Sequence, residues 1–167
     1  MQNNKADFLK RIVENKLIIY KICNSYCKNQ HDRDDLAQEI TYQLWKSYTH
    51  FNGTVKFTTW MYRVALNVAI TFYRKTKTAE AIIKLSEPDT EIIDEKENRD
   101  ELEKNINILQ QFINELKELD KALMILYLEE KSYSEIAEVL GITETNVATR
   151  IGRIKDKLKQ KFSIINK

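Results

Sequence analysis

Apolar residues recur every three or four positions over most of the chain, which is the spacing of one face of an α-helix. The pattern predicts a helix over 8–26 and a second over 36–44, for which Asp32 is placed to act as the N-cap. After a loop that contains Gly53, it predicts a third helix over 57–75. The first half of the chain therefore has the pattern of a small helical bundle.

The second half of the chain continues this pattern in shorter segments. Apolar positions mark one helix over 106–116 and another over 119–126, and two further amphipathic stretches follow. The composition agrees, because the 167 residues include 3 Gly and 1 Pro, whereas sheets with many turns use more of both. We therefore expect an all-α fold with no sheet, made of two small helical domains.

Charge divides the chain into three parts. Residues 1–85 hold 14 basic and 7 acidic side chains, residues 86–119 hold 4 and 11, and residues 120–167 hold 9 and 7. The segment 86–104 carries nine carboxylates, the only proline and no aromatic residue, so little of it can be buried in a core. We predict an acidic flexible linker over 86–104 that joins domains over 1–85 and 105–167. The basic segments 1–85 and 120–167 on either side of an acidic one indicate a polyanionic partner.

The C-terminal stretch "YSEIAEVLGITETNVATRIGRIKDKL" has the pattern of a helix-turn-helix. Gly141 can end the first helix in a left-handed conformation, and Thr143 can cap the second. In the second helix one face is apolar, and the opposite face carries hydrogen-bond donors and cations, namely Asn146, Thr149, Arg150, Arg153 and Lys157. Such side chains pair with base edges and phosphates, so we expect this helix to contact duplex DNA.

The predicted third helix, within "KFTTWMYRVALNVAITFYRK", has five aromatic residues, basic residues at both ends and no acidic residue. A helical wheel assigns most of its apolar residues to a core. It leaves a polar stripe with aromatic side chains at its amino end, made of Trp60, Tyr62, Arg63, Asn67, Thr71, Arg74 and Lys75. Aromatic faces beside basic groups can hold unstacked bases of melted DNA. The alternative interpretation is that Trp60 and Tyr62 are core aromatics.

Two of these segments resemble a known family. "DDLAQEITYQLWKSYTHF" followed by "FTTWMYRVALNVAITFYRK" resembles region 2 of bacterial sigma factors of the extracytoplasmic function (ECF) group of the sigma-70 family, and the helix-turn-helix resembles their region 4. Both occur in the family's order with a linker between them. The resemblance implies a region 2 domain over 1–85 and a region 4 domain over 105–167.

The resemblance also implies a function and its partners. A sigma factor binds core RNA polymerase through the beta-prime clamp and the beta flap, directs it to promoters and promotes DNA opening. The "DLxQE" pattern that faces the clamp corresponds to Asp35, Leu36, Gln38 and Glu39. The minus-10 element would be held by the polar stripe and its aromatic neighbours, and the minus-35 element by the polar face of the last helix. The linker resembles the segment that passes through the RNA exit path.

Three positions depart from the family's pattern. Many members have an acidic residue where Thr71 stands and a lysine where Ala148 stands, and Gly152 costs about 1 kcal/mol inside a helix relative to alanine. These departures motivate the hypothesis that a further DNA-bound protein recruits this sigma factor. Anti-sigma factors are common partners in the group and would cover the polymerase-facing surfaces.

Other functional classes fit less well. A stand-alone helix-turn-helix regulator would leave "DDLAQE" and the aromatic helix unexplained. An enzyme is not expected, because the chain has two histidines and neither a phosphate-binding glycine loop nor a catalytic triad pattern.

The sequence also predicts no cofactor, no metal and no membrane insertion. Cys23, Cys27 and His31 share one helical face and could hold zinc, but a fourth ligand is not close in sequence, so two ordinary half-buried thiols are the preferred interpretation. No run of about 18 apolar residues and no signal-peptide pattern occurs, so we expect a cytoplasmic protein.

Overall fold

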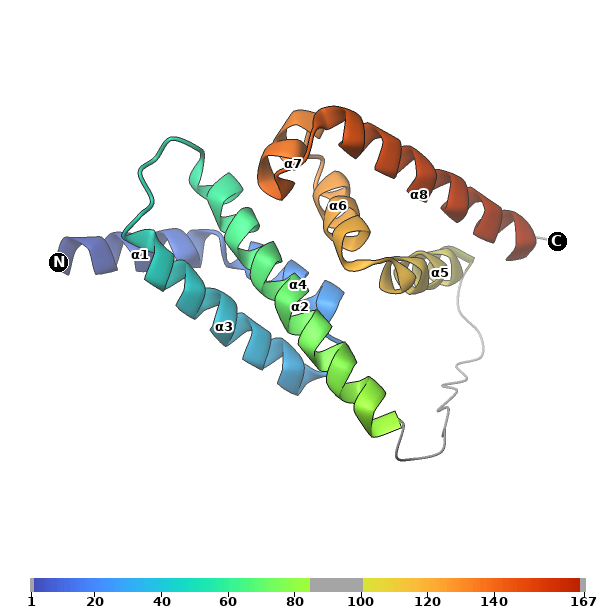
Figure 1. The fold of residues 1–167 in the computed structure, drawn as a ribbon, viewed down its shortest axis with the longest axis horizontal. Helices are drawn as coiled ribbons and strands as arrows, with labels where there is room; N and C mark the ends of the chain where they lie inside the picture. The colour runs from blue at the N-terminus through green and yellow to red at the C-terminus, as the bar shows by residue number, and fades with distance from the viewer. Residues whose placement is uncertain (1, 85–100, 166–167) are drawn as a thin grey trace.

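The computed structural model describes residues 2–84 and 101–165, and these residues form eight α-helices and no strand (Figure 1). The helices are, in chain order, α1 (Gln2–Glu14), α2 (Lys16–Tyr26), α3 (Gln30–Tyr48), α4 (Phe57–Lys84), α5 (Glu101–Glu115), α6 (Glu118–Leu128), α7 (Tyr133–Leu140) and α8 (Glu144–Ile165). We call α1–α4 the N-terminal lobe and α5–α8 the C-terminal lobe. The all-α prediction is confirmed for these residues. The predicted linker lies outside the described residues as far as residue 100, and α5 already begins at Glu101.

The N-terminal lobe is built around α2, α3 and α4, with α3 and α4 side by side along most of their length (Figure 1). Its core is made of side chains that are completely buried, among them Ile22, Leu36, Ile40, Leu44 and Met61. The three residues from α3 lie four positions apart, so one face of this helix supplies the core, as the periodicity predicts.

The first predicted helix is wrong in one respect, because the segment 8–26 is broken into two helices at Asn15. The side-chain amide of Asn15 donates to the carbonyl oxygen of Arg11 at 2.8 Å, and its own carbonyl accepts from the backbone N–H of Ile18. Asparagine competes with helical hydrogen bonding in this way because its short side chain reaches nearby backbone groups. The apolar spacing continues across the break, which is why the pattern did not reveal it.

The N-cap of α3 also differs from the prediction. The helix begins at Gln30, and the side-chain oxygen of Asn29 accepts from the backbone N–H of Asp32 at 2.8 Å. Asp32 therefore lies in the first turn, where the helix dipole still favours its carboxylate. The predicted turn at Gly53 is confirmed, since its φ of 74° is one that glycine adopts without strain.

The C-terminal lobe is centred on α6. Six consecutive residues of this helix, Lys121 to Leu126, are buried, because it is contacted by α5, α7 and α8 of its own lobe and by α2 and α4 of the N-terminal lobe. Leu123 and Leu126 pack into the same cluster as Ile136 of α7 and Ile151 of α8.

The two lobes are in direct contact. Helix α4 contacts both α6 and α7 (Figure 1). One hydrophobic cluster contains buried residues of both lobes, while Phe112, Met124 and Ile154 form a second cluster within the C-terminal lobe. On α4, the buried Tyr62, Ala65 and Ala69 lie on one face, and the small alanines allow a neighbouring helix to approach closely. An ion pair also joins the lobes: the ammonium of Lys21 on α2 lies 2.5 Å from a carboxylate oxygen of Glu129.

Candidate nucleic-acid interface

The C-terminal helices form the predicted helix-turn-helix. Gly141 ends α7 with a left-handed φ of 68°, and the hydroxyl of Thr143 accepts from the backbone N–H of Asn146 at 3.2 Å, which caps α8. A capping box at the start of α7 was not predicted. There Ser132 accepts from the backbone N–H of Glu135, and the Glu135 carboxylate accepts from the backbone N–H of Ser132 at 2.9 Å. The pattern Ser-x-x-Glu is the signal that could have revealed it.

Helix α8 has the two faces that the sequence predicts. Val147, Ile151 and Ile154 are almost completely buried, with exposed fractions of 0%, 1% and 3%. The polar face opposite is formed by four exposed side chains, namely Asn146, Thr149, Arg153 and Lys157. A fixed apolar face holds the helix against the lobe, so the polar face points into solvent.

Arg150, the fifth predicted residue of this face, is half-buried and already engaged. Its Nη1 lies 2.7 Å from a carboxylate oxygen of Asp120 on α6, and its Nε donates to the side-chain oxygen of Asn146 at 3.0 Å. These contacts fix the guanidinium beside the polar face of α8. Contact between Arg150 and DNA would therefore exchange these partners or use its remaining N–H groups.

The predicted stripe on α4 divides into a free part and a covered part. Asn67, Thr71, Arg74 and Lys75 are exposed. The hydroxyl of Thr71 donates to the backbone carbonyl of Asn67 at 2.9 Å, so it keeps only its acceptor capacity for an outside partner. Asn67 and Lys75 are the positions of the stripe that lie fully open to solvent with free side chains in the described part of the chain.

The C-terminal lobe engages both arginines of the stripe. Arg63 Nη2 donates to the backbone carbonyl of Glu138 on α7 at 2.7 Å, and Arg74 Nε lies 3.3 Å from the carboxylate of Glu118 on α6. Arg74 and a hydrogen bond within Glu118 itself hold the pKa of the Glu118 carboxyl below its usual range, the internal hydrogen bond more strongly. In this arrangement a carbonyl and a carboxylate of the C-terminal lobe occupy positions where phosphate oxygens could bind.

The two aromatic residues beside the stripe have different surroundings. Tyr62 is 3% exposed, burial raises the pKa of its hydroxyl to about 12, and the ammonium of Lys131 lies 5.8 Å from its ring centre. Trp60 is half-buried in an aromatic cluster with Phe51 and Phe57, whose ring centres lie 5.1 and 5.4 Å away. Tyr62 is therefore covered in this arrangement, whereas Trp60 keeps one side accessible.

The predicted polymerase-binding residues lie along α3. Asp35, Gln38 and Glu39 are exposed, whereas Leu36 is completely buried and positions the helix from inside. Tyr42 and Trp45, whose exposed fractions are 56% and 41%, were not predicted as site residues. They continue the same face of α3 and line an apolar groove between α3 and α1. Large apolar side chains that stay exposed together mark an interaction surface.

The cysteines do not form a metal site with His31. Cys23 and Cys27 are buried, and burial raises the pKa values of their thiols to about 12 and about 11. His31 is exposed and faces the carboxylate of Asp35 at 3.3 Å, away from the thiols. Both cysteines thus act as small core residues in the described structure. No described helix is both long and apolar enough to cross a membrane.

Two family profiles match the chain. The profile described as Sigma-70 region 2 matches residues 10–78, and the profile described as Sigma-70, region 4 matches residues 106–158. The first range falls within the N-terminal lobe, and the second covers α6, α7 and most of α5 and α8. The order and the placement of the two regions agree with the division into lobes.

Two relatives are similar over most of their length. The ECF RNA polymerase sigma factor SigW of Bacillus subtilis is 30% identical over 155 residues, which is 86% of this chain and 82% of that protein. The RNA polymerase sigma factor SigV of the same organism is 29% identical over 153 residues, which is 91% of this chain and 89% of that protein.

Two solved structures share the fold. CnrH in complex with the cytosolic domain of CnrY has a TM-score of 0.68 at 19% identity, covering 96% of this chain and 90% of that chain. The sigma factor RpoE in complex with the anti-sigma factor NepR from Bartonella quintana has a TM-score of 0.64 at 16% identity, covering 95% of this chain and 98% of that chain. The chain therefore belongs to the sigma-70 family of RNA polymerase sigma factors, in the extracytoplasmic function group.

Proposed function

We propose that this sigma factor reads the minus-35 element with the polar face of α8 and holds the opened minus-10 element on the α4 stripe. The observation that carries the proposal is the geometry of α8, in which exposed Asn146, Thr149, Arg153 and Lys157 stand opposite a completely buried face. A capped helix with donors on its free side can enter the major groove and contact base edges.

The α4 stripe carries the second part of the proposal. Asn67 and Lys75 are exposed, and the half-buried Trp60 lies about two turns before Asn67 on the same helix. Arg63 and Arg74 each give one N–H group to the C-terminal lobe, through the Glu138 carbonyl and the Glu118 carboxylate, and these N–H groups become available to phosphates when that lobe releases them. Promoter DNA and the C-terminal lobe therefore compete for the same two guanidinium groups, and we infer that the lobes separate before the minus-10 element binds.

Helix α3 supplies the polymerase-binding surface in this proposal. Asp35, Gln38 and Glu39 present acidic and amide groups to the clamp of the beta-prime subunit, and Tyr42 and Trp45 add apolar area at the same face. Acidic groups suit a partner helix that carries arginine, because such pairs form charge-assisted hydrogen bonds. The C-terminal lobe contacts the beta flap.

We assign polymerase binding and minus-10 recognition to residues 1–85, the linker to 86–104 and minus-35 recognition to 105–167. Sigma factors are regulatory subunits without catalytic activity, and we assign none to this chain. Its place of action is the cytoplasm, where core polymerase meets the promoter. CnrH was solved in complex with the cytosolic domain of CnrY and RpoE in complex with the anti-sigma factor NepR, and we expect an anti-sigma factor here to cover the α3 and α4 surfaces.

The central experiment mixes the full chain with core RNA polymerase and compares promoter fragments that are either duplex throughout or already open at the minus-10 element. The proposal expects a stable complex with core polymerase and sequence-dependent binding of both fragments. A chain that binds promoter DNA alone and forms no complex with core polymerase would contradict it. The duplex fragment also tests the recruitment hypothesis, because strong initiation that depends on the minus-35 sequence shows that no further DNA-bound protein is needed.

Trp60 is tested by comparing the same two fragments. If Trp60 holds an unstacked base, Trp60→Ala weakens opening of the duplex promoter more than binding of the pre-opened one. A single base–aromatic stack is worth about 1 to 3 kcal/mol. If Trp60→Ala weakens opening of the duplex and binding of the pre-opened fragment equally, Trp60 acts only as a core residue. Phe51→Ala removes a neighbouring ring of the same cluster and is the matched control for lost packing.

Arg150 and Arg153 test the α8 surface. Each substitution by alanine is expected to weaken promoter binding by the equivalent of about 1 to 3 kcal/mol without changing the affinity for core polymerase. The exposed Gln160 on the same helix provides the control substitution. Unchanged promoter binding by both arginine variants would exclude this face as the reading surface.

A further inference from the structure

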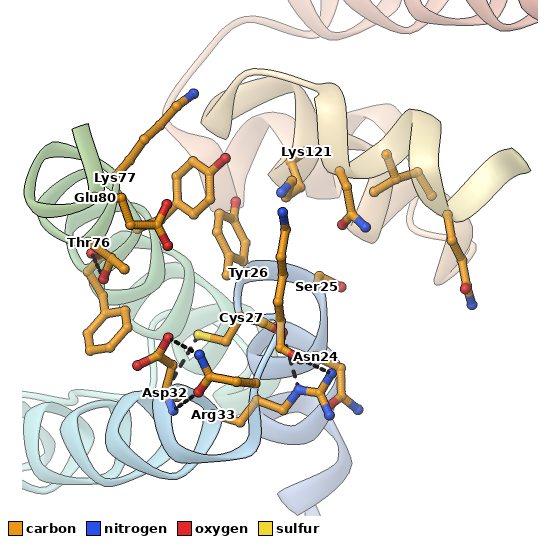
Figure 2. Close-up of a pocket in the computed structure, with 17 residues that line it drawn as sticks. Asn24, Ser25, Tyr26, Cys27, Asp32, Arg33, Thr76, Lys77, Glu80 and Lys121 are labelled. Atoms are coloured by element: carbon orange, nitrogen blue, oxygen red, sulfur yellow. Dashed lines mark hydrogen bonds between the residues drawn. The ribbon is translucent and has the colours of Figure 1, made fainter. Parts of the chain in front are cut away.

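A pocket of about 650 Å³ lies between the two lobes and is not used by either proposed DNA surface. Its walls come from α2 and the loop after it, from the start of α3, from α4, from α5 and from α6, and Figure 2 shows Tyr26 at its centre with Arg33 below and Lys121 above. The volume is within the range of sites for small molecules, about 300 to 1,000 Å³. The pocket exists only while the lobes are in contact, because each lobe supplies part of its wall.

Lys121 is the unusual residue of this pocket. It is 2% exposed, yet within residues 2–84 and 101–165 its ammonium group makes no ion pair and no hydrogen bond, so the little surface that it keeps opens into the pocket that it lines. Two aromatic faces lie next to it, with the ring centre of Tyr73 at 4.8 Å and that of Tyr26 at 5.3 Å. The Glu118 carboxylate, which Arg74 already engages, attracts it from beyond ion-pair distance. A buried ammonium without a carboxylate is rare, because the cost of removing the charge from water is not recovered.

Two further lysines converge on the same pocket. Lys28 lies in the loop after α2, and Lys77 lies on α4 with its ammonium 5.7 Å from the Tyr73 ring centre. Burial lowers the pKa of Lys121, and the positive charges of Lys77 and Lys28 lower it further. The lobes thus close on ammonium groups that repel one another.

The remaining charges of the pocket do not neutralise the lysines. Arg33 donates to the backbone carbonyls of Cys27 and Lys28, so its charge remains uncompensated. The carboxylates of the lining are Asp32, which accepts from the side-chain amide of Asn29 at 2.7 Å, and the exposed Glu80. The lining therefore carries four cations and two carboxylates, and none of the ammonium groups is paired with either carboxylate in the described structure.

We propose that the pocket between the lobes binds a small multivalent anion, of the class of phosphate-bearing metabolites, with Lys28, Lys77 and Lys121 as its cationic ligands. The anion supplies the missing countercharge for Lys121 and bridges lysines that come from both lobes. Its binding therefore holds the lobes in contact and keeps Arg63 and Arg74 engaged by the C-terminal lobe. A duplex does not fit a pocket of this size, which favours a small molecule over nucleic acid as the occupant.

The binding site is tested without polymerase or promoter DNA, so its failure is distinct from failure of the proposed function. The probe is pyrophosphate, titrated into the full chain by calorimetry, with sodium chloride at equal ionic strength as the blank. We expect saturable binding to the wild type and binding at least about tenfold weaker for Lys121→Met, which keeps the apolar stem and removes one charge-assisted contact. Lys10→Met, an equal loss of charge at an exposed site on α1, is expected to bind like the wild type.

A second variant protects the test against a folding defect. Lys77→Gln changes an exposed side chain, so it leaves the core intact and is also expected to weaken pyrophosphate binding. Absence of saturable binding to the wild type would overturn the proposal, as would equal affinities for Lys121→Met and Lys10→Met. Tighter binding of a short single-stranded oligonucleotide than of pyrophosphate, with the same dependence on Lys121, would replace the small anion by nucleic acid and would also overturn it.

Discussion

The contact between the lobes can be weakened by removing a single oxygen atom. The hydroxyl of the buried Tyr26 on α2 donates to the backbone carbonyl of Glu118 on α6 at 2.9 Å, which joins the two lobes. In Tyr26→Phe this hydrogen bond is lost only when the lobes are in contact, because in the separated state the tyrosine hydroxyl bonds to water. The Glu118 carbonyl keeps its helical partner within α6, so the loss is that of one ordinary hydrogen bond, about 1 kcal/mol.

This free energy converts into an affinity. If core polymerase binds only the chain with separated lobes, its apparent dissociation constant is the intrinsic one divided by the separated fraction. Weakening the closed state by about 1 kcal/mol raises that fraction about fivefold where the closed state dominates. Tyr26→Phe should therefore bind core polymerase about fivefold more tightly than the wild type.

The assay is a titration of labelled sigma factor with core polymerase, followed by fluorescence anisotropy. Tyr20→Phe is the matched control, because Tyr20 lies on the same helix, is 63% exposed and makes no hydrogen bond or ring contact in the described structure. Energy transfer between dyes on introduced cysteines at the exposed positions Glu14 and Lys159 reports separation directly. Equal affinities of the two variants, or a weaker complex for Tyr26→Phe, would refute the idea that closure opposes polymerase binding.

Three further predictions concern the stability of the C-terminal lobe, and urea unfolding measures each. Gly152→Ala should stabilise by about 1 kcal/mol because a Cβ there meets nothing within 4 Å, whereas Gly141→Ala should destabilise by about 1 kcal/mol because of its left-handed φ; shifts of the same sign would contradict this. Ile136→Ala should lower the free energy of unfolding by about 2 to 5 kcal/mol because the side chain is completely buried, and a loss below about 1 kcal/mol would contradict its place in the core. The hydrogen bonds from Ser132 lower the pKa of Glu135, so the stability that Glu135 adds over Glu135→Gln is full well above its ordinary pKa of 4.5 and is lost as the pH falls through the lowered pKa; a stability difference that does not change with pH in this acidic range would contradict this.

Local sequence signals predicted much of the C-terminal lobe. Gly141 and Thr143 were recognised from their types and their separation, because a left-handed residue and an N-cap act through neighbouring backbone groups. The buried face of α8 followed from periodicity alone. The Asn15 break was not predicted, because a periodic pattern records which face is buried and not whether the backbone hydrogen bonds continue.

The contact between the lobes lies beyond such signals. A helical wheel assigns Phe57, Met61 and Val68 to a core but does not say which helix covers each of them. Tyr62 was considered as a DNA-facing residue because it borders the polar stripe, and the C-terminal lobe covers it in the folded chain. The burial of Lys121 was not predictable from the sequence either, because lysines are almost always exposed and nothing in its neighbours along the chain indicates burial.

The residues of the aromatic helix α4 thus have roles that depend on the state of the lobes. In the closed arrangement Tyr62 and Ala69 belong to a core that both lobes share, and Arg63 and Arg74 are bound by the C-terminal lobe. When the lobes separate, the same arginines stand beside exposed Asn67 and Lys75, and the surface becomes basic and partly aromatic. The two interpretations of the sequence, core helix and melted-DNA surface, are therefore not exclusive. One helix serves both, because the C-terminal lobe covers in one state the surface that we propose for DNA in the other.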